Sequence, residues 1–229
     1  MEEFWYKNAE VYSNEKFEIN ELGTHPTLVD AFKKYEQNWT TILDYGCGDG
    51  ALVEKLKRRF EVSLFDTSAS MLDIAANKLG MLNPTVYYDA IEIPKKTFDC
   101  VFLSMVLVCV DTEQEIDFIV RRICEAKRSE GYVFVANPHP CFRDRSFSSY
   151  YTEYLIGKSF SYFNEGDRHK IFIRGKPMEF YDYNWSVSFV LNRFIKAGLQ
   201  LVEMIEVEDN ETNEYYNPLF SPSVVYVFK

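Results

Sequence analysis

The segment DYGCGDG at residues 44–50 is the feature that most restricts what this chain can fold into. It follows a short β-rich run at 41–45 and precedes residues 50–59, where apolar residues recur at helical spacing. Glycines between a strand and a helix permit positive φ and let the backbone approach a ligand closely. Open α/β sheets bind ligands at this end of their parallel strands. We therefore expect a ligand-binding loop here, in an α/β fold.

Strand and helix patterns alternate along most of the chain. We predict strands at 41–45, 61–65, 84–87, 98–104, 131–136, 199–207 and 223–228. We predict helices at 50–59, at 71–79 with Ser70 as N-cap, from Asp111 as cap to about 128, and at 185–197. The alternation indicates a doubly wound, mainly parallel sheet of seven strands. Because no repeat or low-complexity linker interrupts it, we expect residues 1–229 to form a single domain.

Residues 138–183 break this alternation and predict an insertion after strand five. The segment holds 12 aromatic residues in 46, a higher density than the 17% of the whole chain. Its seven Lys and Arg slightly outnumber its six Asp and Glu, whereas the whole chain has a net charge of −10. We interpret the segment as a substrate cap. An aromatic subdomain that packs only on itself is the alternative.

Composition excludes several classes of protein. The net charge of −10 argues against a nucleic-acid partner, because such proteins bind phosphates largely through Lys and Arg. The five cysteines form no CxxC pair and suit neither a zinc site nor a disulfide framework, so we expect reduced thiols and no metal. The N-terminus is acidic and aromatic, unlike a secretory signal, and no apolar run approaches the ~20 residues of a membrane span. We expect a cytoplasmic protein without a membrane partner.

Two ligand chemistries compete for the glycine loop. Gly46, Gly48 and Ala51 also satisfy the dinucleotide fingerprint, with Asp66 twenty residues after the first glycine. However, Asp44 lies at the end of strand one, where a carboxylate would repel a pyrophosphate. With Asp89 after strand three, three acids follow three neighbouring strands. This pattern favours a cationic nucleoside such as S-adenosylmethionine (SAM), which carries an ammonium and a sulfonium.

Residues 41–50, 62–72, 88–90 and 98–110 resemble the successive motifs of the class I, Rossmann-like SAM-dependent methyltransferases, in the family's order. The resemblance covers about residues 35–137. It implies the sheet order 3-2-1-4-5-7-6 with the seventh strand antiparallel. It also implies SAM as the cofactor and S-adenosylhomocysteine as its product.

The resemblance further implies a role for each of twelve positions. Gly46, Cys47 and Gly48 would approach SAM through the backbone, with Asp44 near its methionine moiety. Asp66 would hold the ribose hydroxyls, and Thr67 and Met71 would flank the adenine. Asp89 would accept a hydrogen bond from the adenine amino group, and the Ala90 amide would face the ring. Ser104 and Met105 would border the sulfonium, and Tyr12, in the stretch 5–12, would cover the amino-acid end. Core packing and helix capping are the alternative roles for Met71 and Asp66.

The best candidate for a general base is His139, between two prolines just past strand five. Its unperturbed pKa of about 6.5 suits that task, although a histidine packed in a turn is an equal alternative. Many small-molecule relatives carry a His-Pro pair here, but they often add His-His after strand four and Tyr-His-Arg before the last helix. This chain has Val108-Cys109 and Tyr181-Asp182-Tyr183 at those places, so a base is not expected at either.

We therefore expect methylation of an oxygen or nitrogen of a small-molecule metabolite. The Asn-Pro-Pro-Tyr type of run that amino-methyltransferases of nucleic acids place after strand four is replaced here by Ser104-Met-Val-Leu107. Cations of the cap could accept a carboxylate or phosphate, or simply form a solvated face: Arg143, Arg145, Arg168 and Lys170. Methylation of RNA or protein, and a non-catalytic domain that binds SAM or a nucleotide, are the alternatives.

Overall fold

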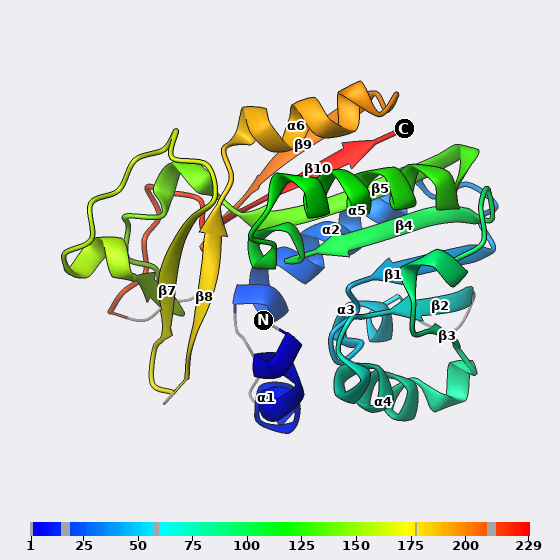
Figure 1. The fold of residues 1–229 in the computed structure, drawn as a ribbon, viewed down its shortest axis with the longest axis horizontal. Coiled ribbons are helices and arrows are strands. Elements are labelled where there is room, and N and C mark those ends of the chain that lie inside the picture. The colour runs from blue at the N-terminus through cyan, green and yellow to red at the C-terminus, as the bar shows by residue number, and fades with distance from the viewer. Residues whose placement is uncertain (1, 15–18, 57–59, 177, 210–213) are drawn as a thin grey trace.

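A seven-stranded sheet forms the centre of the molecule, with a smaller three-stranded sheet beside it (Figure 1). The computed structural model describes residues 2–14, 19–56, 60–176, 178–209 and 214–229. The strands of the large sheet are β1 Thr41–Tyr45, β2 Glu61–Phe65, β3 Thr85–Tyr87, β4 Phe98–Ser104, β5 Lys127–Pro138, β9 Leu201–Val207 and β10 Ser223–Phe228.

The strand order in the large sheet is β3-β2-β1-β4-β5-β10-β9. β1 to β5 are parallel to their neighbours, whereas β10 runs antiparallel to both β5 and β9. Since β9 and β10 are the sixth and seventh strands of this sheet, the order is the predicted 3-2-1-4-5-7-6, with the last strand antiparallel. The predicted fold class is therefore confirmed.

Helices cover both faces of the sheet. They are α1 Glu2–Asn14, α2 His25–Tyr35, α3 Ala51–Glu54, α4 Ala69–Lys78, α5 Glu113–Ala126 and α6 Val187–Lys196. A π-helix covers Ile19–Thr24, and 3-10 helices cover Gly80–Leu82, Ala90–Glu92, Leu107–Cys109, Pro140–Phe142 and Glu153–Ile156. The sequence pattern did not predict α1 and α2.

The two faces have separate hydrophobic cores because successive side chains of a strand point to opposite sides. Leu103 of β4 packs in the core beneath α5 and α6, together with Ile123 and Phe194 of those helices. Its neighbour Phe102 packs in the core beneath α2, against Phe32. The alternation thus explains why β4 is apolar throughout, as predicted for a central parallel strand.

Two predicted helix caps are wrong by one or two residues. Ser68, not Ser70, caps α4, because Ser68 keeps an extended backbone and its Oγ accepts from the Met71 N–H at 3.4 Å. Thr112, not Asp111, caps α5, with its Oγ1 accepting from the Glu115 N–H at 3.3 Å. Within the described residues α3 ends at Glu54, and residues 57–59 of its predicted extension lie outside them.

The insertion after β5 forms the second sheet, seen to the left in Figure 1. β6 Tyr150–Thr152, β7 Asp167–Ile173 and β8 Glu179–Asn184 pair antiparallel. Phe147, Tyr150 and Ile171 form a small core beneath them. The sequence predicted the insertion but not its strands, because charged and aromatic residues in this segment follow no clean alternation. Across the described part of the chain, no helix has the length and apolarity needed to cross a bilayer.

We expect Phe134→Ala to lower the free energy of unfolding by about 3–5 kcal/mol, because this fully buried ring joins the α2 core to the sheet. Urea denaturation measures the loss. Phe163→Ala is the matched control, since the Phe163 side chain is 79% exposed and its loss should cost about 0.5 kcal/mol or less. Equal effects of the two substitutions would contradict this assignment of the core.

Candidate functional site

The loop after β1 is held against the end of β2 by the backbone. The N–H groups of Gly46 and Cys47 both donate to the Phe65 carbonyl, at 2.7 and 3.0 Å. Gly46 has a φ of +76°, and a Cβ at this position would lie 2.2 Å from Val106 Cγ2. Gly48 has a φ of +53°, but a Cβ there would project into open space. Gly46 is therefore required by packing, whereas Gly48 leaves room for a ligand.

Asp44 places a carboxylate in the protein interior at the end of β1. Its side chain is 1% exposed, and its Oδ2 has no hydrogen-bond partner within the described part of the chain. Burial raises the pKa of Asp44 to about 7, and the nearby carboxylates of Asp66 and Asp49 add to the shift. Such an orphaned buried acid is suited to receive a cationic, hydrogen-bonding group.

Asp66 follows β2 and organises the backbone around it. Its Oδ2 accepts from the Gly48 N–H and its Oδ1 from the Ser68 N–H, both at 2.9 Å. Burial raises the pKa of this carboxyl, and the backbone hydrogen bonds partly oppose the shift. Because each carboxylate oxygen can accept a second hydrogen bond, Asp66 can still bind hydroxyl groups of a ligand.

The loop after β3 is positioned from α5. Asp89 accepts from the Ile91 N–H at 2.9 Å and begins the short helix Ala90–Glu92. The buried Arg122 of α5 donates to the Ala90 carbonyl at 2.8 and 3.1 Å and to the Ile93 carbonyl at 2.9 Å. The sequence analysis missed Arg122, because nothing in its helical spacing marks a cation that turns back toward a loop.

The end of β4 carries the most unusual backbone of the site. Met105 has a φ of +57°, uncommon for a residue with a long side chain, and its N–H donates to the Ala136 carbonyl at 2.8 Å. Ser104 Oγ is buried and has no hydrogen-bond partner among the residues described. A strained residue beside an unsatisfied hydroxyl is typical of a functional site.

These segments surround a cavity of about 660 Å³, within the range of ligand pockets. Ten of the twelve predicted cofactor residues line it: Tyr12, Gly46, Gly48, Asp66, Thr67, Met71, Asp89, Ala90, Ser104 and Met105. The other two, Asp44 and Cys47, line an adjoining cavity of about 130 Å³. The structure thus brings all twelve positions together. The Trp5 side chain, from the same predicted N-terminal stretch as Tyr12, lies outside the described residues.

A third cavity, of about 100 Å³, lies between the end of β4 and the inserted sheet. Tyr12 and Met105 line all three cavities, and Cys109 lines the largest and the third. The far wall of the third cavity comes from the insertion and includes Phe180 and Asp182. The three cavities therefore meet at Tyr12 and Met105.

Comparison with known proteins identifies the fold and a match to a methyltransferase domain. Residues 42–131 match the family model described as a methyltransferase domain. A SAM-dependent methyltransferase from Clostridium acetobutylicum superposes with a TM-score of 0.67 at 13% identity, over 97% of this chain and 95% of that one. A putative SAM-dependent methyltransferase from Listeria monocytogenes gives 0.62 at 22% identity, over 88% and 96%. The CcbJ methyltransferase from Streptomyces caelestis gives 0.62 at 17% identity, over 88% and 93%.

Residues 42–131 thus match a methyltransferase domain, and the chain has the class I methyltransferase fold. The match to the family model spans β1 to the start of β5, the part of the chain that carries the glycine loop and the acids after β1, β2 and β3. At these identities the likeness to the solved structures is one of fold. None of the curated proteins searched matches the sequence.

The structure does not bring His139 to the cavities of this methyltransferase. His139 Nδ1 accepts from the Cys141 N–H at 3.3 Å, which leaves the ring proton on Nε2, 3.0 Å from Glu206 Oε1. The ring is 3% exposed, and burial lowers the pKa of His139, opposed by Glu206. Because both ring nitrogens are engaged and the residue lines none of the three cavities, its predicted role as a base stays a prediction that the geometry does not favour.

The four cap cations pair within the protein. Arg168 lies over the Tyr181 ring and Lys170 pairs with Glu179 at 2.7 Å, while Arg145 pairs with Asp144 at 3.3 Å. Arg143 is buried and pairs with Asp182 at 2.5 Å. Nothing in these contacts indicates a phosphate site, and the alternative of a solvated face fits all of them except Arg143.

The raised pKa of Asp44 predicts how stability depends on pH. Between about pH 4 and pH 7 the unfolded chain has lost the Asp44 proton while the folded protein retains it, so the free energy of unfolding falls as the pH rises through this window. Asp44→Asn removes the contribution. We expect the variant to gain stability relative to the unmodified protein between pH 5 and pH 8, measured by urea denaturation without ligand. A pH-independent difference would contradict this prediction.

Proposed function

We propose that this methyltransferase transfers a methyl group from SAM to an oxygen or nitrogen atom of a small-molecule metabolite. SAM supplies an electrophilic methyl group on a sulfonium and leaves as S-adenosylhomocysteine. The observation that carries the proposal is the pair of adjoining spaces, an acid-lined cavity large enough for a nucleoside and a narrow apolar cavity that meets it at Met105.

Charge supports SAM over a dinucleotide. Asp44 is buried in β1 and Asp66 is half-buried just after the neighbouring β2, and no Lys or Arg lines the 660 Å³ cavity among the described residues. A pyrophosphate would meet carboxylates there, whereas the ammonium of SAM would give Asp44 Oδ2 the partner it lacks. The open space at Gly48 lets the ligand lie against bare backbone.

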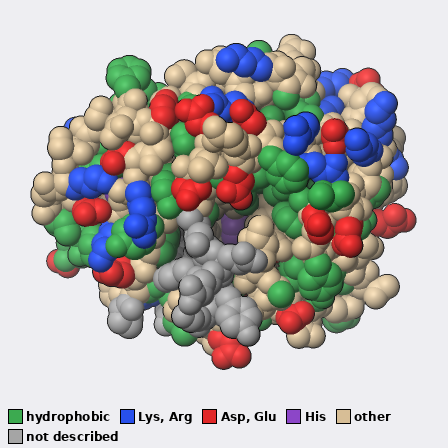
Figure 2. Space-filling model, viewed as in Figure 1, with side chains coloured by type: hydrophobic (Ala, Val, Ile, Leu, Met, Phe, Trp, Pro, Cys, Tyr) green, Lys and Arg blue, Asp and Glu red, His purple; other side chains and the backbone are tan. Residues whose placement is uncertain are grey.

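The third cavity supports a small acceptor. Its volume of about 100 Å³ admits only a compact group, and its lining is mostly apolar. A folded RNA or protein substrate would need a nucleotide or side chain to enter this space. The viewed face also carries acidic and basic side chains side by side, with no broad basic surface among the residues that Figure 2 colours, and the net charge is −10.

Tyr12 and Met105, where the cavities meet, would position the acceptor relative to the methyl group. Methyl transfer is an in-line displacement, so the acceptor atom must lie opposite the sulfur with water excluded. Met105 and Tyr12 separate the two spaces at the point where the methyl group would pass. Burial raises the pKa of Tyr12, with Asp49, Cys109 and Asp66 adding to the shift, so its phenol stays neutral and protonated beside the cofactor.

Asp44→Asn should weaken S-adenosylhomocysteine binding at least tenfold at pH 8, since the ammonium group would lose its charged partner. Isothermal titration measures the affinity. Asp30→Asn is the control, because Asp30 is an exposed residue of α2 that pairs with Lys33 and lines none of the three cavities. Binding of NADPH with no binding of S-adenosylhomocysteine would refute the proposed cofactor.

Catalysis is tested separately by adding a library of small hydroxyl and amino compounds with SAM. We expect S-adenosylhomocysteine to be released with at least one of them and not with transfer RNA or denatured protein. Binding of SAM without release in the presence of any acceptor would favour the non-catalytic alternative.

A further inference from the structure

Asp182 of β8 presents an unused acceptor to the third cavity. The side chain is 3% exposed and lines that cavity, and its Oδ1 has no hydrogen-bond partner within the described ranges. An unpaired buried carboxylate oxygen costs free energy in the ligand-free protein. The sequence predicts no base at Tyr181-Asp182-Tyr183, but Asp182 Oδ1 is a buried hydrogen-bond acceptor without a partner among the described residues.

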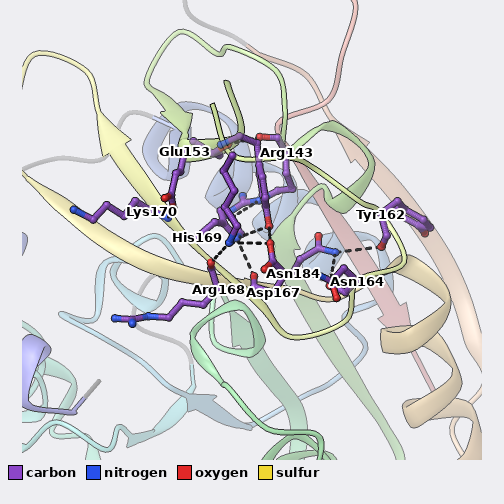
Figure 3. A network of polar contacts seen from close by, with 12 residues as sticks. Arg143, Glu153, Tyr162, Asn164, Asp167, Arg168, His169, Lys170 and Asn184 are labelled. Carbon is purple, nitrogen blue, oxygen red and sulfur yellow. Dashed lines mark hydrogen bonds and ion pairs between the residues drawn. The ribbon is translucent and has the colours of Figure 1, made fainter. Parts of the chain in front are cut away.

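The other oxygen of Asp182 is held in place by Arg143, which belongs to a buried polar network with His169 (Figure 3). Arg143 Nη2 donates to Asp182 Oδ2 at 2.5 Å and to His169 Nε2 at 2.8 Å. Burial, and the neighbouring Arg143 charge, lower the pKa of His169 to about 2, so the ring is neutral. With Nε2 accepting, the ring proton lies on Nδ1, which is 3.1 Å from Tyr154 Oη.

The network is anchored beyond the histidine. Tyr154 Oη donates to Asp167 Oδ2 at 2.6 Å, so it can accept from His169. The hydrogen bonds from Arg143 to Asp182 and to His169, and from His169 to Tyr154, therefore have consistent directions. Together they hold the Arg143 guanidinium against Asp182 Oδ2. Oδ1 is therefore the oxygen of Asp182 that is left without a hydrogen bond among the described residues, and it cannot rotate away without breaking the Arg143 pair.

Charge balance selects the kind of donor that suits Oδ1. Arg143 already compensates the negative charge of Asp182, and His169 is neutral, so the cluster has no net charge. A buried ammonium ion would add an uncompensated positive charge beside the cationic cofactor. A neutral hydroxyl supplies the missing hydrogen bond without that cost.

The walls set the size and polarity of the rest of the acceptor. Tyr150, Ile171, Ile173 and Phe180 enclose the space on the side of the inserted sheet, and Cys109 and Met105 face it from the end of β4. Burial raises the pKa of Cys109, with Asp182 and Asp66 adding to the shift, so this thiol lies within the influence of both carboxylates. The acceptor body should be apolar and no larger than about one ring.

We propose, building on the methyl transfer proposed above, that the third cavity is the acceptor subsite, that it takes a compact neutral hydroxyl compound, and that Asp182 Oδ1 receives the hydroxyl proton. In this step the acceptor oxygen forms a bond to the methyl carbon. The methyl–sulfur bond breaks with its electron pair remaining on sulfur. The hydroxyl proton moves to Oδ1, and the carboxylic acid then returns it to solvent after the product leaves.

The test measures binding, so it needs no known substrate. Protein saturated with S-adenosylhomocysteine is titrated calorimetrically with three probes, which are p-cresol, toluene and benzylamine. p-Cresol should bind at least tenfold more tightly than toluene, which lacks the donor, and more tightly than benzylamine, which is an ammonium at pH 7. Asp182→Asn should abolish the preference, because Arg143 would hold the amide oxygen and turn the NH₂ group into the cavity.

Glu179→Gln is the matched control, since Glu179 lies on the same strand, pairs with exposed Lys170 and should leave the preference unchanged. Equal binding of toluene and p-cresol, tighter binding of benzylamine, absence of binding by all three probes, or a preference that survives in Asp182→Asn would overturn the proposal. If Asp182→Asn does not fold, the comparison of probes on the unmodified protein decides alone. Failure of the protein to bind S-adenosylhomocysteine at all would instead refute the proposed function.

Discussion

The burial of acidic groups at the ends of β1 and β2 is the constraint on which the rest of the site depends. An interior carboxylate without a counterion is costly, and the fold accepts this cost at Asp44 while it satisfies Asp66 with two backbone N–H groups. The glycine loop makes both arrangements possible, because only a residue without a side chain fits against Val106 at position 46. The site is thus suited to a cationic ligand, and in the ligand-free protein the cost appears as a pKa of Asp44 raised to about 7.

Sequence reasoning predicted the parts of this molecule that depend on local pattern. β1, β2, β4 and β10 have the predicted bounds, because buried parallel strands and a buried antiparallel strand read as continuous apolar runs. The twelve predicted cofactor positions line adjoining cavities, and most of them lie at or just after strand ends, where chain order alone implies proximity. The caps of α4 and α5 were misplaced because neighbouring serine, threonine and aspartate residues have similar capping tendencies.

What the sequence did not predict depends on contacts between distant segments. His139 has the residue type and the chain position expected of a base. However, its Nε2 lies 3.0 Å from Oε1 of Glu206, a residue 67 positions further along the chain. Arg143 and Asp182, 39 residues apart, meet only because β8 of the inserted sheet passes beside the turn after β5. The sequence predicts no base at Tyr181-Asp182-Tyr183, because relatives often carry Tyr-His-Arg at this place. In the folded protein Asp182 pairs with the buried Arg143, and the acceptor role proposed for its other oxygen depends on that contact.

Asp44 and Asp182 each have one carboxylate oxygen without a hydrogen-bond partner among the described residues, and they line two different cavities that share Tyr12 and Met105. They differ in one respect that separates their roles. Asp44 has no cation beside it, and burial raises its pKa to about 7, so the site favours a ligand that brings positive charge. Asp182 has Arg143 at 2.5 Å, so its surroundings favour a neutral ligand that brings a hydrogen. In the proposed reaction, the presence or absence of a single guanidinium would direct a charged donor and a neutral acceptor to adjacent spaces, with Met105 lining both.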